Sequence, residues 1–288
     1  MKKLTIGGVP EHFNLPWHLA IESKKFHQKG IDLHWETFHG GTGAMCQALR
    51  DGSIDGAIIL TEGIIKDIIN GNPSKIVKVY VESPLLWGIH VAANSTIQSI
   101  DDLRNARIAI SRFGSGSQLM AIVNAYNNGF DINNLNYEIV NNLAGGIKAL
   151  TQGEADYFMW EHFTTKPYVD KGIFRRIDSV KTPWPCFVLA VRDDVLQHDK
   201  KAIKTVIKVI NKQLKDFKNP LETEGLDQLL ADRYEQKIED IRAWISITKW
   251  NREKSVSKKL INQIQNKLVR FSVIEQDVHY KHLIKKVF

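Results

Sequence analysis

The stretch Ala48-Leu49-Arg50-Asp51-Gly52-Ser53-Ile54-Asp55 recurs as Ala149-Leu150-Thr151-Gln152-Gly153-Glu154-Ala155-Asp156, and the four shared residue types keep one offset of 101 positions. In each copy an Ala-Leu pair suits the sheet-facing side of a helix, Gly suits a left-handed helix end, and Asp precedes the next apolar run. Any junction of helix, glycine and strand shares some of these features. Both copies also follow a glycine-bearing turn, at 40–43 and 144–146, so the repeat favours duplication of a βαβ half.

Short apolar runs alternate with amphipathic stretches in both copies, which predicts an α/β fold of mainly parallel sheets flanked by helices. In the first copy we expect strands at 4–9, 32–37, 56–60 and 76–81, and helices at 15–29, 43–51 and 62–70. In the second copy we expect strands at 107–111, 136–140 and 157–160, and helices at 115–128 and 145–152.

Two proline-bearing segments, at 82–89 and 181–187, flank the second copy. Proline fixes φ and ends strand pairing, so these segments are expected to carry the chain between two lobes. The predicted division is residues 1–84 with 185–288 as one lobe, including a helical C-terminal tail, and 85–184 as the other. Helices in the tail are expected at 194–218, 237–248 and 254–269.

The net charge of +7 is concentrated in the tail. From residue 201 onward there are 19 Lys and Arg against 11 Asp and Glu, and the rest of the chain is close to neutral. Lys204, Lys208, Lys212 and Lys215 recur at helical spacing, which is typical of a solvated helix face. A phosphate-backbone site is the less favoured alternative, and no nucleic-acid partner is predicted.

The N-terminal residues, the longest apolar runs and the two cysteines indicate the cellular compartment and the state of the thiols. The first residues lack the apolar stretch of a signal peptide, and no run approaches the roughly 18 apolar residues that span a bilayer. We therefore expect no integral membrane segment, and a cytoplasmic location as the sequence stands, or a periplasmic or lipid-anchored one if a signal has been removed. A monomer is expected as a separate prediction. Cys46 and Cys186 are expected to be buried thiols, with a single bridge as the alternative.

The order of these features resembles the type 2 periplasmic-binding-protein fold, within the nitrate-, taurine- and thiamine-precursor-type solute-binding proteins of ABC transporters. The resemblance covers nearly the whole chain and rests on 8–17, the Gly41-Thr42-Gly43 turn, both Ala-Leu-x-x-Gly-x-x-Asp elements, 111–117 and 234–250. The stretch 10–22 is similar to a subgroup, found in fungi and bacteria, that lacks an export signal. The resemblance implies a two-lobed binding protein with an ABC permease as partner if it is exported.

An enzyme of the same superfamily makes the pyrimidine precursor of thiamine. With two cysteines, this chain lacks that family's cysteine-rich motif. It also has no nucleophile elbow, no phosphate-binding loop and no His-Glu-x-x-His. We therefore lean against an enzyme and expect no cofactor, although catalytic groups can assemble from distant positions.

In the second lobe, a strand passes into a helix through Ser111, Arg112, Phe113, Gly114, Ser115 and Gly116. Free backbone N–H groups and hydroxyls at such a junction suit an anion or a carbonyl oxygen, so these residues are candidate ligand contacts. The alternative is that Ser115 or Ser117 caps the helix and the glycines relieve crowding. The third glycine of a dinucleotide fingerprint is replaced by Leu119.

In the first lobe, the candidates follow the strands whose carboxyl ends bind ligands in open α/β sheets. They are Pro10, Glu11, His12, Gly41, Thr42 and Glu62, and Glu161 stands at the matching position of the second lobe. Two Glu-His pairs, Glu11-His12 and Glu161-His162, are compatible with metal chelation. A metal site needs three placed ligands and second-shell support, so no metal is predicted.

Trp17, Trp160 and Trp184 each fall at a predicted strand end or crossing, and are candidates for walls around a planar ligand. Core packing is the alternative. Together these residues predict a protein whose lobes close over one small organic molecule, either a pyrimidine-like heterocycle or a small sulfonate or carboxylate, for ABC-type uptake. The acidic Glu62 and Glu161 favour a ligand with donor nitrogens. The alternatives are a cytosolic sensor or carrier and a thiamine-precursor synthase.

Overall fold

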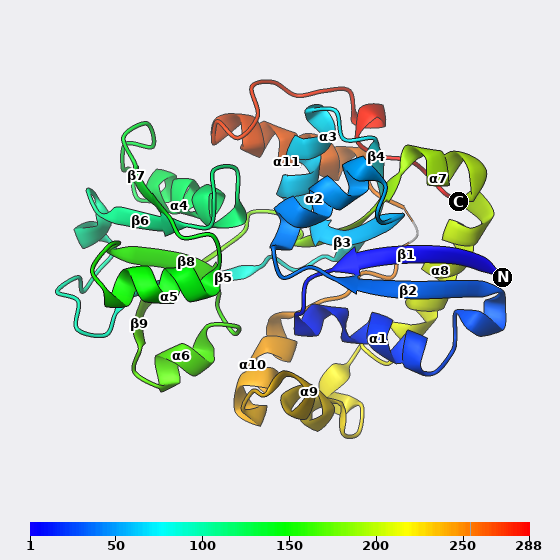
Figure 1. Cartoon of the computed structure of the whole chain (residues 1–288), viewed down its shortest axis with the longest axis horizontal. Helices are drawn as coiled ribbons and strands as arrows, with labels where there is room; N and C mark the ends of the chain where they lie inside the picture. Colours follow the sequence, from blue (N-terminus) through cyan, green and yellow to red (C-terminus); the bar gives the residue numbers. More distant parts are fainter. Residues whose placement is uncertain (254) are drawn as a thin grey trace. The chain divides into compact units, whose positions relative to one another are not determined.

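The computed structural model describes residues 1–253 and 255–288 and contains two compact units (Figure 1). The first unit comprises Met1–Ser83, Trp184–Val269 and Ile274–Phe288, and the second comprises Pro84–Pro183 with Arg270–Val273. The chain leaves the first unit at Ser83 and returns to it at Trp184. Each unit has its own five-stranded sheet.

The first unit is built on a sheet in which four strands point one way and one points the other. Its strand order is β2 (Ile31–Thr37), β1 (Lys2–Gly8), β3 (Gly56–Leu60), β10 (Phe187–Arg192) and β4 (Ser74–Val81). β1 is parallel to β2 and β3, whereas β10 is antiparallel to both β3 and β4. The connections place α1 (Leu15–Glu22) on one face, and α2 (Gly41–Asp51) with α3 (Thr61–Ile69) on the other (Figure 1).

The second unit repeats this sheet. Its order is β7 (Asn136–Ile139), β6 (Arg107–Ile110), β8 (Tyr157–Glu161), β5 (Leu86–Ala92) and β9 (Phe174–Lys181). β6 is parallel to β7 and β8, and β5 is the reversed strand. The helices are α4 (Gly116–Asn127), α5 (Leu143–Thr151) and α6 (Lys166–Asp170). The predicted mainly parallel α/β architecture is confirmed, with one inserted antiparallel strand making each sheet mixed.

The two copies of the repeat occupy the same structural position. Gly52 and Gly153 both follow a helix with positive φ, at 82° and 71°. Asp55 Oδ2 accepts a hydrogen bond from the backbone N–H of Thr5, and Asp156 Oδ2 accepts one from the N–H of Arg107. Each aspartate therefore ties the start of its own strand to the neighbouring parallel strand, β1 in the first unit and β6 in the second, which explains why Asp recurs there.

Apolar side chains from the sheet and its helices form a separate core in each unit. In the second unit, Ala109 and Phe158 from the sheet pack with Ala149 and Leu150 from α5, so the Ala-Leu pair of the repeat faces the sheet as expected. In the first unit Ala48 and Leu49 are likewise buried. Cys46 and Cys186 are both buried free thiols.

The tail covers the edge of the first sheet at β4. Ile284 forms a parallel bridge with Ile76, and Trp250 an antiparallel bridge with Val81. Nζ of the buried Lys78 donates to the backbone oxygens of Asn251 and Glu253. Because an exposed edge strand is a template for pairing with other chains, the tail protects this edge.

Several element boundaries differ from the sequence prediction. The expected helix 15–29 ends at Glu22, because Lys24 takes a positive φ of 55° and only a short 3-10 turn follows at His27–Lys29. The expected helix 194–218 is broken at Asp199 into α7 (Asp193–His198) and α8 (Lys200–Gln213). Strands β5, β9 and β10 and the helix α9 (Leu226–Tyr234) were not foreseen. α10 (Ile238–Ile247) matches, and α11 (Lys258–Arg270) begins later than 254, a residue outside those described.

Candidate functional site

One edge of the first unit gathers most of the residues predicted in that unit. β1 and β3 are parallel, so the segment after Gly8 and the segment after Leu60 emerge at the same edge. The reversed strand β10 begins there too, and the N–H of Thr61 donates to the backbone oxygen of Cys186 at 3.0 Å. We call this the acidic edge, defined by Glu11, Glu62, Trp184 and Cys186.

Glu62 is the most unusual group of the acidic edge. It lies in the first turn of α3 and its residue is only 2% exposed. Its Oε2 accepts a 2.8 Å hydrogen bond from the indole Nε1 of Trp184, whereas no described residue donates to Oε1. Burial raises the pKa of Glu62 to about 7. A buried carboxyl oxygen without a donor is costly, and such groups are concentrated at functional sites.

Glu11 contributes a second negative charge to the same place. Burial raises the pKa of the Cys186 thiol, and the charges of Glu62 and Glu11 raise it further. The thiol therefore stays protonated and is a poor nucleophile. Both carboxyls thus act on one buried thiol between β10 and the turn after β1.

His12 is held in an aromatic environment beside Glu11. Its ring centroid lies 4.0 Å from that of Trp244 and 5.8 Å from that of Tyr234, and its Nε2 finds no partner among the described residues. Burial lowers the pKa of His12 to about 3, so its imidazole is neutral. It can offer a donor or an acceptor to a ligand, but not a positive charge.

The turn that carries Glu11 and His12 is anchored from distant parts of the chain. The backbone oxygen of Phe13 accepts hydrogen bonds from Tyr80 Oη at 2.8 Å and Trp250 Nε1 at 3.0 Å. Asn14 Nδ2 donates back to the oxygen of Val9 at 2.9 Å. Pro10 is exposed at the start of this turn. These bonds fix the turn against β4 and the tail, so its side chains are preorganised.

The predicted glycine turn lies beside α3. Gly41 takes a φ of +63° and opens α2, which suits glycine. A Cβ at Gly63, next to Glu62, would lie 2.4 Å from Cγ2 of Thr42, so glycine lets α2 and α3 approach closely. The structure therefore places Thr42 against the start of the helix that carries Glu62.

In the second unit, the predicted loop forms a cluster of three buried hydroxyls, from Ser111, Ser115 and Ser117. Ser117 Oγ accepts from the N–H of Ser111 at 2.9 Å and lies 3.0 Å from Ser115 Oγ. Ser115 Oγ also accepts from the N–H of Gln118 at 3.3 Å and caps α4. The helix-capping alternative therefore applies to Ser115. We call this set the hydroxyl edge.

The other residues of this loop face outward. The Phe113 side chain is exposed, with its residue 62% accessible, and its ring meets Tyr137 edge to face at 5.8 Å. Arg112 is half-buried, and Gly114 takes a φ of +75° while its N–H donates to Gln118 Oε1. An exposed aromatic ring over a glycine-containing turn is a suitable surface for stacking on a planar ligand.

Glu161 lies at the end of β8 and, unlike Glu62, is bonded by its own turn. Its Oε2 accepts a 2.6 Å hydrogen bond from the N–H of Thr164. Burial raises the pKa of Glu161, and the turn bonds and the Arg176 charge partly oppose that rise. Arg176 donates to Nε2 of His162 at 2.7 Å and to Nε2 of His90 at 3.2 Å. Burial is the largest cause that lowers the pKa of His90 to about 3 and that of His162 to about 4, and the Arg176 charge lowers both further, so both imidazoles are neutral.

The predicted tryptophans have different environments. Trp17 lies within the core of the first unit, stacked on Phe26 with ring centroids 5.8 Å apart. Trp184 is buried at the acidic edge and holds Glu62. Trp160 is half-buried, stacks on Phe158 at 5.2 Å and meets Trp87 edge to face at 6.4 Å.

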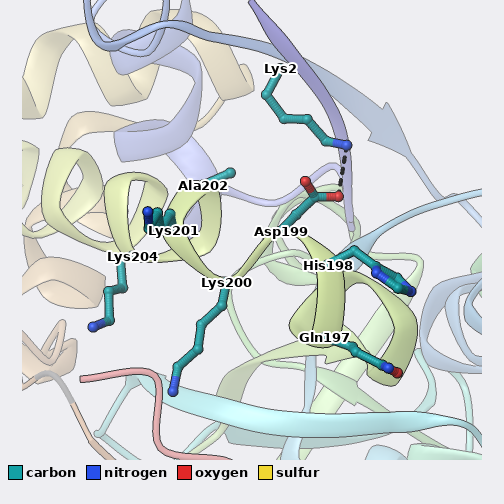
Figure 2. Close-up of a pocket in the computed structure, with 8 residues that line it drawn as sticks. All are labelled: Lys2, Gln197, His198, Asp199, Lys200, Lys201, Ala202 and Lys204. Atoms are coloured by element: carbon teal, nitrogen blue, oxygen red, sulfur yellow. Dashed lines mark ion pairs between the residues drawn. The ribbon is translucent and has the colours of Figure 1, made fainter.

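A surface hollow of about 670 Å³ lies at the opposite end of β1 (Figure 2). Its lining is largely basic, and Lys2 pairs with Asp199 at 2.7 Å across it. The complete lining is Lys2, Gln197, His198, Asp199, Lys200, Lys201, Ala202 and Lys204. At about 3.3 Å per strand residue, β1 separates this hollow from the acidic edge by roughly 20 Å, and none of the predicted ligand residues lines it.

Four residues of these edges were missed by sequence reasoning: Arg176, Tyr234, Trp244 and His90. The first binds two histidines, and the next two surround His12. The stretch 234–250 was singled out for the resemblance, and its aromatic residues Tyr234, Trp244 and Trp250 were the available signal. Arg176 carried no local signal, because its partners His90 and His162 lie 86 and 14 positions away along the chain.

Comparisons with known proteins agree with this architecture. Residues 87–180 match a family model described as Ca3427-like PBP. The solved structure of the Candida albicans CA3427 gene product, which defines a family with the generic periplasmic-binding-protein fold, superposes with a TM-score of 0.90 at 25% identity, over 99% of this chain and 97% of that one.

More distant structures share the fold. The alkanesulfonate-binding protein SsuA of Xanthomonas axonopodis pv. citri, bound to MOPS, superposes with a TM-score of 0.81 at 15% identity, over 99% of each chain. The periplasmic nitrate-binding protein NrtA of Synechocystis PCC 6803 gives 0.72 at 15% identity, over 98% of this chain and 84% of that one. No curated protein sequence matches significantly.

Proposed function

The chain is a type 2 periplasmic-binding-fold protein related to the Ca3427-like family, and on that premise we propose that it binds one small organic molecule reversibly. The observation that carries this proposal is the Oε1 atom of Glu62, a buried carboxyl oxygen without a described donor at the edge where parallel strands end. A ligand that donates to this atom removes the cost of leaving it unpaired.

Each unit, taken by itself, carries groups suited to contact such a ligand. The acidic edge offers carboxyls beside the indole of Trp184, and the hydroxyl edge offers Ser111 and Ser115 beside the exposed ring of Phe113. A few fixed polar groups among aromatic rings are typical of small-molecule sites. The candidate contacts remain Pro10, Glu11, His12, Gly41, Thr42, Glu62, Ser111, Arg112, Phe113, Gly114, Ser115, Gly116, Trp160, Glu161 and Trp184, and the core position of Trp17 makes it a supporting residue.

The biological role proposed is delivery of the ligand to an ABC-type permease if the protein is exported. A sensor or carrier role applies if it is cytosolic. No described helix is long and apolar enough to cross a membrane. A ligand-induced complex with a permease encoded beside this protein would support uptake, and a cytosolic fraction that retains the ligand after cell lysis would support the sensor or carrier.

Native mass spectrometry of freshly purified protein, followed by a thermal-shift panel, tests the binding proposal. The panel contains 4-aminopyrimidine, benzamidine, ethanesulfonate, nitrate and acetate. At a hundredfold excess over Kd, a true ligand stabilises the folded state by about 2.7 kcal/mol, which moves Tm by several degrees.

One control variant and two site variants test whether the ligand-induced shift in Tm comes from the candidate contacts. Lys204→Ala, in the basic hollow at the far end of β1, should leave the ligand-induced shift unchanged. Trp160→Ala and Ser115→Ala should each reduce it without unfolding the protein. If no co-purified ligand is found and no compound shifts Tm, while pyridoxal phosphate forms a lysine adduct, synthase-like chemistry replaces the binding proposal.

A further inference from the structure

We propose that the acidic edge of the first unit recognises a nitrogen group rich in N–H donors, such as an amidine or a protonated aminoheterocycle, and that Glu62 is its acceptor. This inference rests on the proposed function and narrows its ligand class. It sets this chain apart from the structures named above for alkanesulfonate and nitrate, which are anions.

The geometry of Glu62 singles out a donor group. The Trp184 indole fixes the carboxyl by bonding Oε2, and so leaves Oε1 as the acceptor for an incoming group. An anionic ligand has no proton to donate to this oxygen. An amidinium or aminoheterocycle presents N–H groups in a plane, which match a carboxylate.

The charges around Glu62 point the same way. Glu11 and Glu62 both raise the pKa of the Cys186 thiol, so both carboxyls contribute negative charge at the acidic edge. Among the described residues, the shift at Glu62 has burial as its largest cause, opposed by hydrogen bonds from a backbone N–H and from Trp184, with no cation contributing. An anion entering here would meet the negative charge of the Glu62 carboxylate. A cation would be attracted by both carboxyls.

Recognition of a cation by Glu62 requires its carboxylate form, so binding is linked to pH. The titratable groups around it are Glu11 from the turn after β1, Cys186 at the start of β10, and Lys66 one turn further along α3. Burial holds the pKa of Glu62 at about 7, so near neutral pH the empty protein is partly protonated there. A bound cation displaces that proton, and affinity should rise with pH through about 7.

Isothermal titration calorimetry with benzamidine and 4-aminopyrimidine as donor probes, and ethanesulfonate and nitrate as anions, tests this inference. Benzamidine stays cationic from pH 5.5 to 8, so its affinity reports on the protein. We expect benzamidine affinity to rise about tenfold or more over that range, since each pH unit below the pKa removes roughly tenfold of the carboxylate form. Titrations at pH 6.5 in two buffers of different ionisation enthalpy should show net proton release.

Glu62→Gln should weaken benzamidine binding at pH 8 by at least about tenfold and flatten the pH dependence. The control Glu222→Gln, at an exposed carboxyl of the first unit that is not among the candidate contacts, should keep the affinity and its pH dependence. Proton release by the unmodified protein needs no variant, so a poorly folded Glu62→Gln protein leaves the inference testable.

The outcomes separate the inference from the proposed function. Tighter binding of ethanesulfonate or nitrate than of both donor probes overturns the inference while leaving a binding protein. Donor-probe binding without proton release, or unchanged by Glu62→Gln, also overturns it. If no compound of the thermal-shift panel and no compound of the calorimetry panel binds, the proposed function itself is overturned.

Discussion

The two units share one sheet topology but differ in how the buried polar groups at their edges are hydrogen-bonded. At the hydroxyl edge, Ser111, Ser115 and Ser117 bond one another and nearby backbone, and Glu161 is bonded by Thr164. At the acidic edge, Glu62 keeps an oxygen that no described residue bonds. The hydroxyls of one edge bond one another and nearby backbone, whereas the carboxyl of the other edge keeps an acceptor oxygen for the ligand that we propose.

The offset of the repeat shows that the two buried carboxyls are not copies of each other. With Gly56 matched to Tyr157 at the starts of β3 and β8, Glu62 corresponds to Phe163 and Glu161 to Leu60. The scaffold was repeated, but each carboxyl stands at a position where the other unit has an apolar residue. Fold and recognition are therefore specified by different residues of the same segments.

The largest expected effect contrasts the two carboxyls in the unliganded protein. The pKa of Glu62 is about 7 in the folded state against about 4.5 when unfolded, so the folded state binds more protons between these values. Its contribution therefore lowers the free energy of unfolding as pH rises from 4.5 to 7. Glu62→Gln should raise that free energy by up to about 3 kcal/mol at pH 8, and have little effect at pH 4.

Glu161→Gln should change stability less than Glu62→Gln. Burial raises the pKa of both carboxyls, but the turn hydrogen bonds and the Arg176 charge partly oppose the rise at Glu161. The amide also weakens the hydrogen bond from the N–H of Thr164, which costs about 1 kcal/mol and offsets the gain from removing a buried charge at pH 8. Urea unfolding of both variants at pH 4 and 8 measures the difference. Equal effects of the two substitutions would mean that the edges are not distinct.

Removing single hydroxyls from the hydroxyl edge should have a smaller effect on the free energy of unfolding. Ser117→Ala removes the acceptor for the buried N–H of Ser111, and should cost about 1–3 kcal/mol. Ser115→Ala removes the cap of α4 and should cost about 1 kcal/mol. Chemical denaturation compares them, and a larger loss for Ser115→Ala would show that capping, not the hydroxyl cluster, holds this loop.

The smallest effects should come from the glycines of the repeat. Gly52→Ala and Gly153→Ala each force a side chain into left-handed backbone, which costs about 1 kcal/mol. Gly153 has open space around a Cβ, whereas at Gly52 a Cβ would lie 2.6 Å from an Arg192 nitrogen that must move. Thermal unfolding should therefore show Gly52→Ala as slightly the more destabilising, and a clear reversal would contradict this account of the two junctions.

The features predicted correctly from the sequence are those set by neighbouring residues. The helix ends at Gly52 and Gly153 and the buried Ala-Leu pairs depend on local pattern, which periodicity reports directly. The reversed strands β5 and β10 were not predicted, because each begins in a proline-bearing segment that was interpreted as a linker between the lobes.

The site was predicted as a set of residues but not as an arrangement. Glu62 and Trp184 were both named, yet their hydrogen bond joins residues 122 positions apart, and no local spacing encodes it. Trp17 stands at a strand-to-helix junction, but Phe26 and Tyr80 enclose it in the core. Side-chain direction at such junctions is decided by tertiary packing.

The hydrogen bond from Trp250 to Phe13 spans 237 positions and fixes the turn that carries Glu11. During synthesis the chain emerges from its N-terminus, so this turn is made among the first residues and secured among the last. Long-range contacts of this kind slow folding. The acidic edge is therefore completed late, and a chain interrupted before residue 250 would have its carboxyls but not the support that positions them.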